Sequence, residues 1–147
     1  MNATQAIELA LLLPLASAGL TVLFGRRPNV RETATLLVAG ALFLTVLTLL
    51  PGILAGDRPA WTLLEILPGL ALAFAIEPLG MLFALVASAL WIVTSIYSIG
   101  YMRGNDEGHQ TRFYACFAIA IFAAIGVAMA ANMLTLFVFY EVLTIST

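Results

Sequence analysis

Glu141 is the residue whose setting most directly implies chemistry, because it is a carboxylate inside the apolar run 132–145 and no basic residue stands near it in the sequence. If this run is a membrane helix, Glu141 lies ~13 Å beyond Asn132, close to the middle of a ~30 Å hydrocarbon layer. A charge at that depth costs ~2.5–3.5 kcal/mol on insertion scales, so such residues usually face a protein interior or a wet path and have a partner. The pattern predicts a site of proton relay or modulation at Glu141.

Four other residues could take part in chemistry, but each is better explained by a structural role. His109 lies in the polar loop 104–112, where a histidine is usually solvated. Cys116 is the single cysteine and lacks the spaced partners of a zinc or iron–sulfur site, so we interpret it as a packing residue. Glu8 is close to the start of an apolar segment and Glu77 precedes Pro78, so both carboxylates suit the positive end of a helix dipole. We therefore expect no cofactor-binding residues and no metal ligands.

Composition indicates an integral membrane protein. The chain is 63% hydrophobic and 10% charged, whereas a soluble domain is about 45–50% apolar and about 25% charged. All six basic residues are arginine and the formal net charge is -2, so the sequence gives no support for nucleic-acid binding. The expected surroundings are a lipid bilayer and other membrane subunits.

The positions of the apolar segments predict an all-α membrane protein with about five transmembrane helices, the last one truncated. The expected spans are 4–24, 33–54, 78–101, 113–131 and 133–147. Residues 16–18 resemble a signal-peptide cleavage site, but Glu8 and the lack of early positive charge favour an uncleaved first span. Small residues at Gly126 and Ala130 predict a face on which helices approach closely.

The segment between the second and third spans has a different period. Large residues alternate with alanine over 70–76, which predicts a short strand, and residues 61–66 could supply its partner across the turn signal Pro68-Gly69. The interpretation is a short external β-hairpin. The alternative is an irregular or interfacial helical stretch, because alanine is a poor strand former.

The arginines predict the orientation of the helices. Arg26, Arg27 and Arg31 lie between the first two spans and Arg103 and Arg112 between the third and fourth, whereas the loop between the second and third has only Arg58. By the positive-inside rule the N-terminus should lie outside, most simply in a prokaryotic inner (plasma) membrane.

The second half of the chain carries a family resemblance. The segments EPLGMLFALV at 77–86, LWIVTSIYSIGYM at 90–102, RFYA at 112–115 and LFVFYEVLTIST at 136–147 resemble the start of an antiporter-like subunit. That family includes the proton-pumping membrane subunits of complex I, the Mrp-type sodium/proton antiporters and the membrane-bound hydrogenases. The resemblance covers about half the chain and is carried most specifically by the acid of the fifth helix, while the first half agrees only in architecture.

The resemblance implies proton or sodium/proton translocation within a multisubunit membrane complex. In the family the glutamate matching Glu141 pairs with a lysine on a later helix, and the fold consists of two inverted helical repeats around a hydrated axis. This sequence has no lysine, so we expect residues 1–147 to be a single transmembrane helical region at the N-terminal part of a longer subunit. Such a chain would not be catalytic alone, although its complex could be a proton-pumping oxidoreductase.

Two alternatives remain. The chain could be a packing or assembly subunit whose glutamate only forms a salt bridge with a neighbour, or a small self-contained four-span protein. The sequence leaves open which reaction drives the complex.

Overall fold

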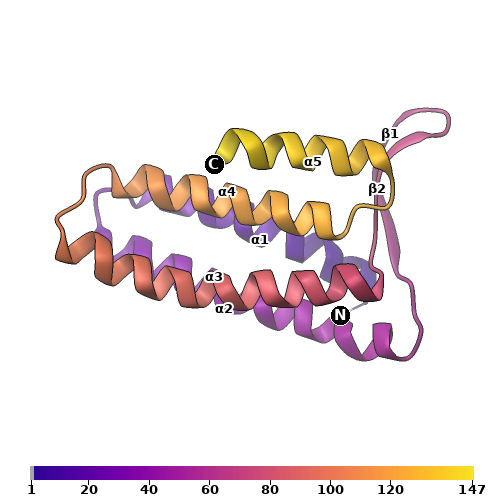
Figure 1. Cartoon of the computed structure of the whole chain (residues 1–147), viewed down its shortest axis with the longest axis horizontal. Helices are drawn as coiled ribbons and strands as arrows, with labels where there is room; N and C mark the ends of the chain where they lie inside the picture. The colour runs from indigo at the N-terminus through magenta and orange to yellow at the C-terminus, as the bar shows by residue number, and fades with distance from the viewer. Residues whose placement is uncertain (1) are drawn as a thin grey trace.

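The computed structural model describes residues 2–147 and consists of a helical bundle with one β-hairpin (Figure 1). The helices are α1 (Ala3–Leu23), α2 (Pro28–Leu54), α3 (Pro78–Gly104), α4 (Gln110–Ala128) and α5 (Met133–Ser146), and the strands β1 (Ala60–Leu67) and β2 (Leu70–Ala75) lie between α2 and α3. We call the end of the bundle where α1 and α3 end and α2 and α4 begin the arginine end. The hairpin lies at the opposite end, which we call the hairpin end.

The all-α membrane fold predicted from the sequence is confirmed. Helices α1 to α4 are each long and apolar enough to cross a membrane, whereas α5 has 14 residues. At ~1.5 Å of rise per residue, α5 is ~21 Å long and falls short of a ~30 Å hydrocarbon layer. It runs beside α4 from the hairpin end and stops part-way along the bundle (Figure 1).

Several helix ends differ from the sequence-based spans, and most of the differences lie at the arginine end. Helix α2 begins at Pro28, five residues before the expected Thr33, because a proline at the first helical position costs no hydrogen bond. Helix α3 continues to Gly104, and α4 spans Gln110–Ala128 where 113–131 was expected. Polar residues at these ends are therefore helical, which brings Arg31 and Arg103 onto helices that were expected to exclude them.

The β-hairpin is confirmed. β1 and β2 pair antiparallel from Ala60↔Ala75 to Leu67↔Leu70, with two irregularities in the register. Gly69 has φ +84° in the turn, a conformation that glycine adopts without steric cost. Along β2 only Phe74 is buried, and Leu70 at the hairpin tip is 41% exposed, so the alternating pattern forms a buried face only near the helices.

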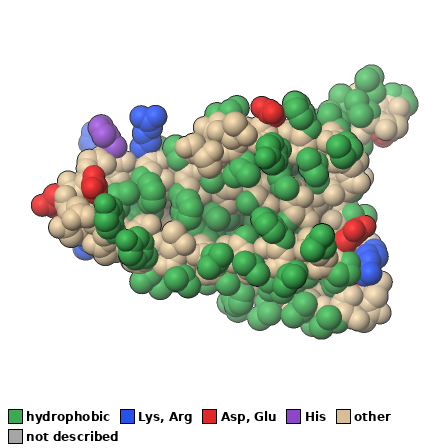
Figure 2. Space-filling view, in the orientation of Figure 1, with side chains coloured by type: hydrophobic (Ala, Val, Ile, Leu, Met, Phe, Trp, Pro, Cys, Tyr) green, Lys and Arg blue, Asp and Glu red, His purple; other side chains and the backbone are tan. Residues whose placement is uncertain are grey.

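The core lies between the helices, which approach closely at Gly80, against the backbone of Ala128, and at Gly126. The largest fully buried side chains include Trp91, Tyr114 and Phe74. A Cβ at Gly126 would overlap the ring of Phe139 on α5, so the small-residue face expected on α4 receives a helix of the same chain. Outside this core the displayed face is largely hydrophobic, and charged side chains gather mainly toward the two ends (Figure 2).

Candidate functional site

Glu141 lies on α5, nine residues beyond the cap at Asn132, and its side chain is exposed on the surface of the bundle. Its neighbours along the same helix, Phe137 and Tyr140, are 60% and 57% exposed. Both ion pairs formed within residues 2–147 involve other side chains, so Glu141 has no cationic partner in the described part of the chain. The structure of residues 2–147 thus leaves this acid on an outward apolar helix face without a counter-charge, an arrangement that is costly inside a membrane.

The first turn of α5 is fixed by a polar cap that includes the hairpin. Asn132 accepts hydrogen bonds from the backbone N–H of Thr135 at 2.8 Å and from its hydroxyl at 2.9 Å. The Asn132 amide donates to the carbonyl of Ala71 at 2.7 Å, and the backbone N–H of Ala73 donates to the Thr135 hydroxyl at 3.0 Å. Two side chains of the helix that carries Glu141 are thus bonded to β2.

The backbone before α5 is bonded to the same strand. The N–H of Ala75 donates to the carbonyl of Met129 at 2.8 Å, and the N–H of Ala131 donates to the carbonyl of Ala73 at 2.9 Å. Together with the bridge between Phe74 and Ala130, these bonds make 129–131 a short third partner of the hairpin. The hairpin therefore determines where α5 begins.

An aromatic contact holds the middle of α5 two residues before Glu141. The Phe139 ring meets Phe74 edge-on at a centroid distance of 5.4 Å and Phe122 at 5.1 Å. It lies in the space left by Gly126 and is 6% exposed. Because Phe139 is two residues from Glu141, this packing sets the rotation of α5 and keeps the carboxylate on the outer face.

A second set of charges, which the sequence analysis missed, is buried at the arginine end. Glu32 accepts from Arg31 at 3.3 Å and from Arg103 at 2.6 Å, so one carboxylate from α2 joins two guanidinium groups from α2 and α3. The side chains of Arg31 and Glu32 are 4% and 5% exposed, and that of Arg103 is 46% exposed. We call these three residues the ionic cluster.

Helix α4 completes the surroundings of Arg31. The Arg31 guanidinium donates to the hydroxyl of Thr111 at 3.0 Å and to the side-chain carbonyl of Gln110 at 2.9 Å. It also lies 5.0 Å from the centre of the Tyr114 ring. The partners of Arg31 on α4 are 79 and 80 residues away in sequence. The sequence analysis places Arg31 in a loop and assigns no role to Glu32. The one local signal is that the pair Arg31-Glu32 follows the helix-starting Pro28 by three and four residues.

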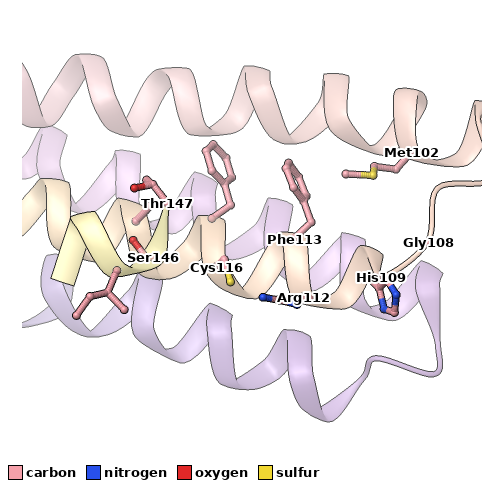
Figure 3. A pocket seen from close by; sticks show the side chains of 11 residues that line it. Met102, Gly108, His109, Arg112, Phe113, Cys116, Ser146 and Thr147 are labelled. Atoms are coloured by element: carbon pink, nitrogen blue, oxygen red, sulfur yellow. The ribbon is translucent and has the colours of Figure 1, made fainter.

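The remaining predicted residues lie apart from Glu141. Glu77 is the exposed N-cap of α3 and makes no side-chain capping bond, although Pro78 begins the helix as expected. Glu8 is half-buried beside an apolar hollow next to β1 and α5. His109 and Cys116 line a groove of about 580 Å³ between α4 and the end of α5, in which Thr147 also lies (Figure 3).

Comparisons with known proteins bear on this arrangement. The family model "NADH-Ubiquinone oxidoreductase (complex I), chain 5 N-terminus" matches residues 69–114. The Na(+)/H(+) antiporter subunit A1 of Staphylococcus aureus strain bovine RF122 / ET3-1 is 28% identical over 108 residues, and the match covers 72% of this chain and 13% of that relative. The subunit A1 of strain JH9 matches with the same identity and coverage.

A solved structure matches the fold. A chain of the membrane-bound sulfane sulfur reductase, an archaeal respiratory membrane complex, superposes with a TM-score of 0.81 at 18% identity, covering 96% of this chain and 22% of that chain. This chain therefore spans only a small part of the length of the proteins it matches. Sequence and fold together confirm the resemblance: this integral membrane chain is similar to the antiporter-like subunits of multisubunit membrane complexes.

Proposed function

We propose that this chain takes part in proton or sodium/proton translocation within a multisubunit membrane complex, and that Glu141 relays or modulates the proton. The observation that carries the proposal is a carboxylate on the outer face of a rigidly anchored apolar helix, with no cation among residues 2–147 to neutralise it. The antiporter subunits that it resembles are named for Na(+)/H(+) exchange. The complex as a whole, rather than this region alone, would carry the driving reaction.

The partner of Glu141 is expected outside these 147 residues. The chain contains no lysine, and its match covers 13% of the antiporter relative. A cation on another transmembrane segment could approach the exposed face of α5 without moving the hairpin or the Phe139 contact. We propose that residues 1–147 act as one helical region that presents Glu141 to such a segment.

The test is Glu141→Gln in the complete complex, a change that keeps shape and hydrogen bonding but removes the titratable charge. Coupling energies of 1–3 kcal/mol correspond to effects of about 5–150-fold, so translocation per assembled complex should fall by at least about five-fold. Glu77→Gln is the matched control and should do much less, because Glu77 is at a helix end. Normal flux in well-assembled Glu141→Gln would refute the proposed role, and equal losses from both variants would show that depth in the helix is unimportant.

A packing or assembly role is the competing function. In that case Glu141 would only pair with a neighbouring cation, and its removal would leave that cation unpaired in the membrane. Loss of assembly together with normal flux in the complexes that still form would favour this second function.

We also propose that the N-terminus lies outside a prokaryotic inner (plasma) membrane. Arg31 and Arg103 meet at the arginine end, and Arg58 lies beside the hairpin. In a Cys116→Ala background, a cysteine at Asn105 should be shielded from an impermeant thiol reagent added outside, and one at Asp57 should react. The reverse labelling pattern in sealed cells would overturn the orientation.

A further inference from the structure

A continuous apolar stripe runs along the outside of α3. Its residues are between 49% and 78% exposed and follow one another at alternating steps of four and three: Leu79, Phe83, Val86, Leu90, Val93 and Tyr97. Residues at this spacing lie on one face of a helix. We call these six residues the outer stripe, and the displayed face of the bundle around α3 is largely hydrophobic (Figure 2).

The two faces of α3 differ in the size of their side chains. Four of the buried residues on the inner face are small: Ala84, Ser88, Ser95 and Ser98. Small residues let membrane helices approach closely, and α3 packs on α2 and α4 through this face. Every residue of the outer stripe is large, which keeps another helix at a distance, whereas fluid acyl chains can fill the space around large side chains. The size pattern therefore favours lipid over a further helix on the outside of α3.

The outer stripe ends in a pair of tyrosines near the arginine end. Tyr97 and Tyr101 are exposed, and their rings stack with centroids 6.0 Å apart. Tyrosine is enriched where a bilayer meets water, because its ring is apolar and its hydroxyl is polar. Leu79 and Tyr97 are 18 residues apart, which is ~27 Å of helix and close to the ~30 Å thickness of the hydrocarbon layer. The stripe has the length of that layer and ends in residues suited to its boundary.

We infer that the outer stripe contacts the acyl chains of the bilayer and that Tyr97 and Tyr101 lie in the interfacial layer at the arginine end. Helix α3 is then at the periphery of the complex, and other subunits contact this chain from other sides. Arg103 lies beyond the tyrosines along α3, so its half-exposed guanidinium reaches the headgroups and water. The inference does not rest on the proposed function, because no residue of α3 acts in it.

The test places a fluorescent probe on single cysteines of the complete complex in vesicles of phosphatidylcholine, part of which carries a nitroxide quencher on one acyl chain. The background contains Cys116→Ala and no other reactive cysteine. At Val86→Cys, half-way along the stripe, a nitroxide near the chain end should quench more strongly than one near the headgroup. At Tyr97→Cys this order should reverse. Absence of quenching at both positions would show that protein covers this face and would overturn the inference, and the same order at both would contradict the boundary at the tyrosines.

Tyr140→Cys on α5 is the matched control. Tyr140 is as exposed in this chain as the outer stripe, but the proposed function places another segment over its face. A probe there should be quenched less than one at Val86→Cys. Equal quenching at Tyr140→Cys would still place the outer stripe in lipid, and it would count against the proposed partner of Glu141 instead.

Discussion

Glu32 and Glu141 are both glutamates on apolar helices, but their surroundings are opposite. Glu32 is buried and receives two arginines, whereas Glu141 is exposed on the outer face of α5 and receives none within residues 2–147. The charge of Glu32 is therefore satisfied inside the chain and ties α2 to α3, while that of Glu141 has no counter-charge within residues 2–147. Under the proposed function, the paired charge of Glu32 serves the fold and the unpaired charge of Glu141 serves translocation.

The largest effect on stability is expected at the ionic cluster. Glu32→Gln removes the carboxylate between two guanidinium groups and leaves the buried Arg31 without its counter-charge. Breaking a buried pair from one side costs about 3–5 kcal/mol; because Arg103 is half-exposed, we expect about 3 kcal/mol for Glu32→Gln. Thermal unfolding of the purified complex in detergent measures the loss.

Glu107→Gln is the control for that experiment. Glu107 is an exposed acid at the same end of the bundle, and its replacement should change stability by less than about 0.5 kcal/mol. Equal losses of stability in the two variants would mean that the burial of Glu32 does not make it more important than the exposed Glu107.

A smaller effect is expected where α4 and α5 touch. In Gly126→Ala the new methyl group would overlap the Phe139 ring, and overpacking of this kind costs about 1–3 kcal/mol. Because Phe139 fixes the rotation of α5, translocation should fall along with stability. Gly100→Ala in α3 is the control, since no atom lies within 4 Å of its added Cβ. If Gly126→Ala is tolerated as well as Gly100→Ala, the contact between Gly126 and Phe139 does not position Glu141.

The smallest effect is expected at the helix caps. Comparing two caps separates the effect of the position of α5 from the effect of lost stability. Asn132→Ala and Asn2→Ala each remove an N-cap bond, which costs about 1 kcal/mol. Only Asn132 also bonds the hairpin, so only its variant should shift α5 and reduce flux per assembled complex. Matching flux in the two variants would contradict a positioning role for the cap.

The sequence predicted the elements of the fold because their signals are local. Apolar length marked the spans, alternation with alanine marked β2, and Pro68-Gly69 marked the turn. The close approach of helices at Gly126 also followed from a small residue at a regular spacing. The hydrogen bonds between the hairpin and residues 129–131 could not be predicted from the sequence, because they join segments more than fifty residues apart.

The ionic cluster was missed for the same reason. An arginine in a membrane helix is costly unless it has partners, and the partners of Arg31 on α4 lie 79 and 80 residues further along the chain. The local sequence pattern therefore predicts that Arg31 lies in a loop, where it bears only on the orientation of the helices in the membrane. Glu141 was singled out because its isolation from basic residues is visible in the sequence itself, although its role stays a prediction.

The most direct test compares Glu141→Gln with Glu32→Gln in the complete complex, with assembly and proton flux measured on the same vesicles. We predict that Glu141→Gln assembles normally and loses at least about five-fold in flux per complex. Glu32→Gln should instead reduce assembly and leave the flux of the surviving complexes nearly unchanged. Normal flux in assembled Glu141→Gln, or a flux defect confined to Glu32→Gln, would contradict the division between structural and functional charge.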